Sequence, residues 1–559
     1  MPVKKSEVEE KLKELAREAE EREAGRRAKK AGVLYLDAKT APINIEALAL
    51  LPEEMALKAK AAVVETNEQK AEATLAVVDP EEPAIKEAIQ LLESKKYKPL
   101  IFCVSLSGLK HILNFYKYVP KEQEKITGAI KVEEERLIGL KKTLTSLEDV
   151  KGALQVANEE NVYAGELLEI ILAGALANRA SDIHLEPEEN SIKLRLRIDG
   201  LLHDVFSELK KNAYLYLLSR IKLLSELKLN VHDEPQDGRF SVKLPHKEVE
   251  VRVAVAPAEF GEVVVMRLLD PEAINLSLAD LGLREDDLEI IEAELKKPNG
   301  MILNTGPTGS GKTTTIYAFL KHKKVPELKI ITIEDPIEYQ LPDIEQTQVD
   351  EEAGYTFRDG LKSLMRQDPY VILVGEIRYK ETAGIAIQAA LTGHLVFSTV
   401  HANEAAGVIP RLLDLEVRAS SIGPALNLII AQRLVRRLCE NCKTPEKINP
   451  ELKQKIEKFL SGLPKRLSRE GYKEIKIYKA KGCEKCNNFG YGGRIGIYEL
   501  ALIGPEMEDL INKETNEAKL HEHAIRRGMI TMQQDGILKT ITGITAFEEV
   551  ELITGPIGW

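Results

Sequence analysis

The chain has little of what marks secreted, membrane-spanning or nucleic-acid-binding proteins. Only five of its 559 residues are cysteines, too few for a disulfide scaffold. No apolar run approaches the roughly 18 residues that a membrane-spanning helix needs. The N-terminal residues are charged where a secretory signal peptide would have its apolar core, so we predict no secretory signal peptide. A net charge of −11 provides no overall basic field, so we expect no direct nucleic-acid partner and membrane contact only through other proteins.

A phosphate-binding loop is the strongest signal present. Residues 306–313 fit the pattern G-x-x-x-x-G-K-[ST] between an apolar strand and a helical segment. The glycines let backbone N–H groups turn toward an anion, and the following helix adds its positive end. The alternative is a glycine-rich turn without a ligand. We expect Lys312 to reach the β- and γ-phosphates of ATP and Thr313 to ligate Mg²⁺, in a nucleotide site made of Gly306, Pro307, Thr308, Gly309, Ser310, Gly311, Lys312, Thr313 and Thr314.

Four cysteines form two Cys-x-x-Cys pairs, Cys439/Cys442 and Cys483/Cys486. Two such turns place four thiolates around one tetrahedral metal, and zinc suits this donor set in a reducing compartment. A filled site of four thiolates has no open position, so we expect a structural Zn²⁺. The alternative is two redox or coincidental pairs. The lobe of about 436–500 has few other large apolar residues, so the metal is expected to order it.

Three apolar strands predict further residues of the nucleotide site. They end at Glu334, at Glu376 and before His401. Ligands of open α/β sheets bind beyond the carboxyl ends of strands, where these side chains would lie. Hydrolysis needs one carboxylate to orient water and one to hold Mg²⁺, directly or through water. We expect His401 to sense the γ-phosphate, because His394 stands at the other end of the same strand; the alternative for His401 is a structural histidine. Either carboxylate could instead be a capping or surface group.

Patterning along the chain predicts a multidomain α/β protein. Asp199-Gly200 and Asp237-Gly238 are expected to be turns between short alternating strands. The predicted parts are a charged helical arm (1–30), a small α/β domain (31–118), a linker (119–160), a middle α+β domain (161–275) and a C-terminal parallel-sheet domain (276–559) that includes the cysteine lobe. We expect the arm to be solvated; the alternative is an arm that docks on a partner.

Together these segments resemble the secretion ATPases of type II secretion and type IV pilus assembly. The resemblance implies a RecA-like P-loop ATPase core, a PAS-like middle domain and a rotary homo-hexamer. It also implies a cytoplasmic location beside the inner membrane, with a membrane platform protein as partner. It rests on residues 181–187, 194–200, 235–240, 306–313, 334–336, 366–369, 375–378, 392–401 and 431–434 and on the four cysteines.

The resemblance also gives roles to arginines. Arg252 and Arg267 would reach the neighbouring subunit's phosphates as arginine fingers. Without the resemblance, each could instead be an ordinary exposed strand residue. Arg366, Arg378 and Arg411 match positions that link subunits. The family usually has Asp where this chain has Tyr370 and Tyr379. Because the arm lacks Arg-Leu-Gly-type repeats, no cyclic dinucleotide ligand is predicted.

The predicted function is a hexameric ATPase motor that drives extension of a type IV pilus or a type II secretion pseudopilus. The four-cysteine insertion and the 31–118 domain favour extension over a retraction motor, which generally lacks both. A DNA-translocating P-loop ATPase is a second alternative, and the acidic balance disfavours it. A non-hydrolysing zinc scaffold is a third, and the presence of Lys312, Thr313, Glu334 and Glu376 disfavours it.

Overall fold

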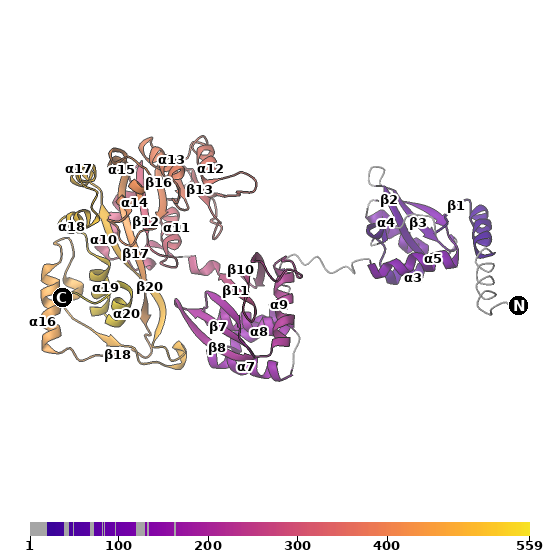
Figure 1. Cartoon of the computed structure of the whole chain (residues 1–559), viewed down its shortest axis with the longest axis horizontal. Helices are drawn as coiled ribbons and strands as arrows, with labels where there is room; N and C mark the ends of the chain where they lie inside the picture. The colour runs from indigo at the N-terminus through magenta and orange to yellow at the C-terminus, as the bar shows by residue number, and fades with distance from the viewer. Residues whose placement is uncertain are drawn as a thin grey trace. The chain divides into compact units, whose positions relative to one another are not determined.

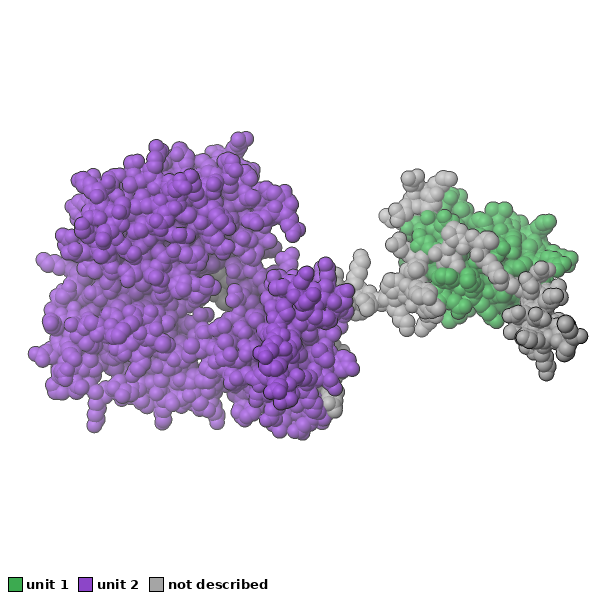
Figure 2. All heavy atoms as spheres, in the orientation of Figure 1, with its two compact units in different colours: residues 1–126 green, residues 127–559 purple. Residues whose placement is uncertain are grey.

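The computed structural model forms two compact units, residues 1–126 and 127–559 (Figure 2). None of the described helices is both long and apolar enough to cross a bilayer. The described residues are 19–38, 44–48, 50–67, 72–80, 82, 84–95, 97–118, 129–130, 134–160, 164–274 and 276–559.

The first unit is a small α/β domain with a four-stranded sheet in the order β1-β4-β3-β2. Strands β3 and β4 are parallel, and β2 runs antiparallel to β3. The small α/β domain expected for residues 31–118 is thus present in the described residues, and Cys103 at the end of β4 is buried. Its elements are β1 (Leu34–Tyr35), α2 (Ile45–Leu48), α3 (Glu53–Ala59), β2 (Ala61–Asn67), β3 (Glu72–Val77), α4 (Ile85–Ser94), β4 (Lys98–Cys103), α5 (Leu106–Leu113) and η1 (Asn114–Tyr118).

The described part of the N-terminal arm is a helix over residues 19–31. It is not solvated all round, because Ala24 and Ala28 are buried. Glu21 accepts a hydrogen bond of 2.8 Å from the Ser105 hydroxyl. The expectation of a solvated helix is therefore wrong for this part, and residues 1–18 of the predicted arm lie outside the described residues.

The second unit begins with a seven-stranded sheet in the order β5-β9-β10-β11-β6-β7-β8, antiparallel except between β5 and β9. The predicted alternation is confirmed, since every second residue of β7 is buried. The elements are β5 (Ala129–Ile130), α6 (Glu134–Thr143), α7 (Leu147–Glu160), α8 (Ala164–Ala177), β6 (Asp182–Pro187), β7 (Ile192–Ile198), β8 (Leu201–Leu209), α9 (Lys211–Leu224), β9 (Gln236–Leu244), β10 (Lys247–Ala258), β11 (Gly261–Leu269) and η2 (Pro271–Ile274).

Two local expectations differ from this part of the structure. Asp199-Gly200 is the expected turn, with both residues at positive φ. Asp237-Gly238 is not a turn but lies inside β9, paired with β10. A Cβ at Gly238 would lie 2.3 Å from the Ser225 carbonyl oxygen, so the glycine permits a close backbone approach. The segment expected as a linker contains α6 and α7, both packed on α8.

The C-terminal sheet has the order β14-β13-β15-β16-β12-β17-β20 and is parallel except for β20 (Figure 1). This confirms the expected parallel-sheet core. Its elements are η3 (Leu278–Leu281), α10 (Glu285–Leu295), β12 (Gly300–Thr305), α11 (Lys312–Lys323), β13 (Ile330–Glu334), β14 (Glu345–Gln348), α12 (Phe357–Leu364), β15 (Val371–Val374), α13 (Lys380–Leu391), β16 (Leu395–Val400), α14 (Val408–Asp414), α15 (Ala419–Ala425) and β17 (Leu426–Leu438).

Apolar cores cover both faces of this sheet. Along β12, Met301 and Leu303 enter one core and Ile302 enters the other. Strands buried on both faces read as continuous apolar runs, which is why the sequence revealed them. Parallel strands also bring their carboxyl ends to one edge of the sheet, where the predicted site residues follow.

The cysteine lobe shares an apolar core with residues that follow it in sequence, contrary to expectation. Ile456 and Ile477 pack with Ile537 and Ile541 of a helix that follows the lobe in sequence. The sequence argument counted only residues 436–500 and missed this contribution. The elements here are β18 (Thr444–Pro445), α16 (Pro450–Gly462), η4 (Glu470–Tyr472), β19 (Tyr478–Lys479), η5 (Glu484–Cys486), β20 (Tyr491–Leu502), α17 (Pro505–Lys513), α18 (Glu517–Arg526), α19 (Met532–Ile541) and α20 (Phe547–Thr554).

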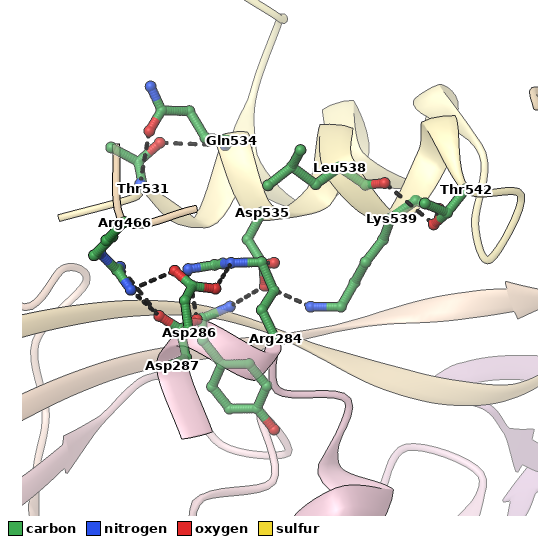
Figure 3. Close-up of polar contacts among 11 residues, drawn as sticks. Arg284, Asp286, Asp287, Arg466, Thr531, Gln534, Asp535, Leu538, Lys539 and Thr542 are labelled. Carbon is green, nitrogen blue, oxygen red and sulfur yellow. Dashed lines mark hydrogen bonds and ion pairs between the residues drawn. The ribbon is translucent and has the colours of Figure 1, made fainter. Parts of the chain in front are cut away.

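A buried charge cluster joins three separate parts of the C-terminal domain (Figure 3). Arg284, just before α10, lies 2.6 Å from Asp287 and 2.7 Å from Asp535 of α19. Lys539 approaches Asp535 to 2.5 Å. Arg466 of the lobe adds pairs with Asp287 and Asp286, so three positive and three negative side chains balance. Such balance is the condition under which charges are tolerated in an interior.

Candidate nucleotide-binding and metal sites

The phosphate loop connects the end of β12 to the start of α11. Gly306, Gly309 and Gly311 have φ of 150°, 78° and 88°. A Cβ at Gly306 would lie 2.5 Å from the Gln432 carbonyl oxygen, so no larger residue fits there. The glycines thus meet the conformational and steric demands of a loop whose N–H groups face an anion.

The ammonium group of Lys312 lies within the curve of this loop. It donates to the carbonyl oxygens of Gly306 at 2.8 Å and Pro307 at 3.1 Å. Burial lowers the pKa of Lys312, and the nearby Glu376 carboxylate opposes this effect. A partly desolvated cation held at a nest of N–H groups is suited to phosphate oxygens.

A cavity of about 390 Å³ opens over the loop, within the usual range of about 300–1,000 Å³ for ligand pockets. It is lined by Lys312 and Thr313 and also by Glu334, Glu376 and His401. The structure therefore brings together the residues predicted from four strand ends. His394 is apart from them at the start of β16, near the Ala389 carbonyl.

The two predicted carboxylates differ in how firmly they are held. Buried Glu334 accepts hydrogen bonds from Tyr317 at 2.5 Å, Thr332 at 2.6 Å and Gln346 at 3.1 Å. These partners come from a helix and two strands, and none of them was predicted from the sequence. With both oxygens engaged, Glu334 is restrained as a positioning or metal-orienting group would be.

Glu376 pairs with two side chains that are themselves largely exposed, Arg378 and His401. Its Oε1 lies 2.6 Å from Nη2 of Arg378, and its Oε2 lies 3.4 Å from Nε2 of His401. The Glu376 side chain is 13% exposed, whereas Arg378 is 55% exposed. A carboxylate at the cavity wall that is not locked by the core is the better placed of the two to orient water.

The two proposed finger arginines occupy different surroundings. Arg267 lines the cavity of its own chain, and its Nε donates to Asp182 at 2.9 Å. Burial alone would raise the pKa of Asp182, but hydrogen bonds from Arg267 and Ser181 outweigh it and the pKa is lowered. Arg252 donates to Glu338 at 2.8 Å and to the Ile337 carbonyl at 2.7 Å. Both arginines therefore have partners within the chain.

The other family-matched positions lie at the surface. Arg366 and Arg411 are exposed, as are the rings of Tyr370 and Tyr379. Neither tyrosine replaces a buried acid, so these departures leave the cavity intact. Their exposure leaves all four available for contact with another molecule.

The four cysteines converge on one point. All four sulfur atoms lie within 4.8 Å of one another, and the described chain has no disulfide among them. Cys439–Cys483, Cys442–Cys486 and Cys483–Cys486 are separated by 3.9, 3.8 and 3.7 Å. Four sulfurs at about 2.3 Å from a tetrahedral metal would be about 3.8 Å apart. The cluster thus fits a four-thiolate metal site.

The second cysteine turn also touches the middle domain, a contact that the sequence did not predict. Asn487, at φ 50°, accepts a hydrogen bond of 2.8 Å from the Leu147 N–H and donates to Asn178 at 2.9 Å. Phe489 stacks on His203 at 4.0 Å. The only sequence signal is the pair Asn487-Asn488, a residue type that tolerates left-handed turns.

Comparison with known proteins gives consistent matches. A family model described as "Type II/IV secretion system protein" matches residues 157–552. The type II secretion system ATPase E of Vibrio cholerae is 41% identical over 397 residues, 71% of this chain and 76% of the relative. The type IV pilus assembly ATPase PilB of Myxococcus xanthus is 35% identical over 532 residues, 95% of this chain and 90% of the relative.

A solved structure agrees at the level of the fold. The Legionella pneumophila ATPase DotB aligns with a TM-score of 0.50 at 20% identity, covering 69% of this chain and 95% of that one. At this identity the likeness concerns the fold alone.

Proposed function

The chain belongs to the type II/IV secretion system protein family, and on this basis we propose that it is an ATPase motor for extending a type IV pilus or a type II secretion pseudopilus. The observation that carries the proposal is the cavity over the phosphate loop. It brings Lys312, Thr313 and Glu376 to one place. These residue types are what hydrolysis of ATP to ADP and phosphate requires.

In this proposal the protein binds, orients and stabilises, and the reaction is an in-line attack of water on the γ-phosphorus. The loop N–H groups and Lys312 hold the β- and γ-phosphates. Glu376 accepts a hydrogen bond from the attacking water, and Arg378 and His401 hold its carboxylate in place. Mg²⁺, held through Thr313 and water near Glu334, would offset charge on the phosphate oxygens. The bond between the γ-phosphorus and the β–γ bridging oxygen breaks, that oxygen stays with ADP, and the attacking water becomes part of inorganic phosphate, which leaves with the released proton.

Arg252 and Arg267 are proposed to act on the phosphates of a neighbouring subunit. Arg267 already lines a nucleotide cavity and is 54% exposed, so its guanidinium is free to exchange partners. Arg252 would first have to leave Glu338. Hydrolysis would then depend on assembly, because each subunit would need the fingers of its neighbour even though Arg267 also lines the cavity of its own chain.

The proposed partners follow from the family and from the metal cluster. We propose a homo-hexamer at the cytoplasmic face of the inner membrane, bound to a platform protein of the secretion or pilus system. The four cysteines are proposed to bind one structural Zn²⁺, which thiolate spacing supports. Extension is favoured over retraction because the likeness to PilB covers 95% of the chain and thus includes the first unit.

The test is ATPase activity as a function of protein concentration. Specific activity should rise with concentration while the hexamer assembles and then become constant. Lys312→Ala serves as the matched inactive control, with hexamer content followed by light scattering. If specific activity stayed constant from monomer to hexamer, the proposal that the site depends on assembly would be contradicted. If no ATPase activity were found at any concentration, the proposed ATPase function itself would be contradicted.

A further inference from the structure

Gln432, in the middle of β17, lies directly beneath the phosphate loop. Its side chain is buried, and one atom, Oε1, accepts two hydrogen bonds. Asn304 donates at 3.0 Å and Thr315 donates at 2.8 Å. Asn304 is two residues before the loop and Thr315 is four residues after its last glycine. A single oxygen therefore joins the strand that enters the loop to the helix that leaves it.

The loop itself touches the same residue at both ends. A Cβ at Gly306 would lie 2.5 Å from the Gln432 carbonyl oxygen. A Cβ at Gly311 would lie 2.8 Å from the Gln432 Nε2. Two of the three glycines with positive φ are thus required partly because Gln432 occupies the space beneath them.

The next residue, Arg433, reaches the loop that carries His401. Its Nη2 donates to the Asn403 carbonyl at 3.0 Å, and its Nη1 donates to the Gln432 carbonyl at 3.0 Å. A Cβ at Gly306 would lie 3.1 Å from that Nη1. The guanidinium therefore stands between the start of the phosphate loop and a residue two positions beyond His401.

Strand geometry explains how adjacent residues serve two loops. Successive side chains of a strand point to opposite faces. Ile430 and Gln432 face the core that contains α11, whereas Ala431 and Arg433 face the other core. The charge of Arg433 also contributes to the lowered pKa of Lys312, as expected of two cations beside one loop.

We propose that Gln432 and Arg433 are positioning residues of the nucleotide site. Gln432 holds the phosphate loop in its anion-binding shape, and Arg433 fixes the loop after β16 so that His401 keeps its place relative to that site. Neither residue lines the cavity, so both act through other groups. The inference rests on the proposed function, because it assigns roles within that site.

The two roles predict different kinetic effects, measured on the full chain. Q432A and Q432E should weaken binding of fluorescent methylanthraniloyl-ADP by at least about tenfold, since a displaced loop costs contacts to both phosphates. Q432E also places a negative charge beneath an anion site. R433K should keep ADP affinity within about twofold and lower kcat by about tenfold, because an ammonium group cannot bridge two carbonyls in the fixed geometry of a guanidinium.

Asn427 offers a matched control on the same strand. It donates to the Asn299 carbonyl at 3.0 Å, at the opposite end of β12 from the loop. N427A should therefore leave ADP affinity and kcat unchanged. Hydrogen exchange of the amides of residues 306–312 should accelerate in Q432A and not in N427A.

Each possible result decides the proposal. ADP affinity in Q432A and Q432E equal to that of wild type would overturn it. Losses that only follow a reduced folded fraction, measured by thermal unfolding, would make these residues structural and overturn it too. Wild-type protein that neither binds nor hydrolyses ATP would contradict the proposed function itself. If the wild type hydrolyses ATP and Q432E keeps the ADP affinity of the wild type, only this inference is contradicted.

Discussion

Arg284 and Asp535 form a buried ion pair, with 2.7 Å between Nη1 and Oδ1, that joins the start of the C-terminal domain to α19 (Figure 3). Asp535 also pairs with Lys539 and accepts the Tyr498 N–H at 2.8 Å. One carboxylate therefore compensates two buried cations. The stability of the domain should depend on it more than on any exposed pair.

Asp535→Asn should destabilise the C-terminal domain by about 3–5 kcal/mol, because it leaves Arg284 and Lys539 incompletely compensated. Trp559, the only tryptophan, lies edge-on to Phe547 of α20, and its fluorescence during denaturant unfolding reports on this region. Glu514→Gln, which removes an exposed pair with Lys519, is the control and should leave the transition in place. If Asp535→Asn and Glu514→Gln had the same denaturant unfolding transition, the stabilising role of the buried charge cluster would be refuted.

Asp287 predicts a pH dependence of stability. Burial raises the pKa of Asp287 to about 6, despite its pairing with Arg284 and Arg466 and beside Asp286 and Asp535. An unfolded Asp has a pKa of about 3.9. Between about pH 4 and 6 the folded state holds the proton that the unfolded state has released. The contribution of this group is therefore full below pH 4 and is lost as pH rises toward 6. Unfolding of Asp287→Asn, followed through Trp559, should lack this fall; an identical pH profile would contradict the assignment.

Lys312→Ala should abolish hydrolysis through loss of the phosphate contact, whereas Glu376→Gln should retain ATP binding and lower kcat by about 10²–10³-fold. Binding is checked with a fluorescent nucleotide and turnover by phosphate release. Glu334→Gln distinguishes the carboxylates, because it disturbs the contacts to Tyr317 and Thr332. Wild-type turnover in Glu376→Gln would move the water-orienting role to Glu334.

Arg252→Ala and Arg267→Ala should fold and lose most ATPase activity. Mixing either variant with Lys312→Ala should restore part of it, because one subunit keeps the finger and the other keeps the loop. Arg195→Ala is the control, since Arg195 pairs with Asp204 within the middle domain and is not among the residues lining the cavity. Stable mixed hexamers without any rescue would mean that the arginines act within their own subunit or not at all.

Metal analysis should find one zinc per chain, lowered in Cys483→Ser with little change in nucleotide affinity. The lobe should loosen around the cysteines but not unfold, because Ile456, Ile477 and Ile537 retain their own core. Full zinc content in a Cys439/Cys483 double mutant, or iron with visible absorbance in the wild type, would contradict the site.

The sequence predicted the family, the fold class and the convergence of the strand ends because those depend on local patterns. Continuous apolar strands identify a parallel sheet, and its topology brings Glu334, Glu376 and His401 together. The misassigned turn at Asp237-Gly238 shows the limit: glycine there permits close contact with Ser225, and a glycine alone does not reveal which constraint it meets.

Contacts between segments that are far apart in the sequence could not be predicted, because no local pattern encodes them. The pairing of Arg252 with Glu338, the core shared by the lobe and α19, and the hold of Gln432 on the phosphate loop all join residues with no common periodicity. Roles for the site residues, the hexamer and the zinc stay predictions until the experiments above are done.

The contact between Asn487 and Leu147 sets an order of events during synthesis. The middle domain leaves the ribosome several hundred residues before the cysteine turn that satisfies the Leu147 N–H. At about 5–20 residues per second, the helix that begins at Leu147 spends tens of seconds without its partner. The contact is completed only after Asn487, which follows Cys486 directly and has a φ of 50°, has been made. Chains that lack the metal proposed for the four cysteines should therefore keep a folded middle domain whose Leu147 N–H is without this partner.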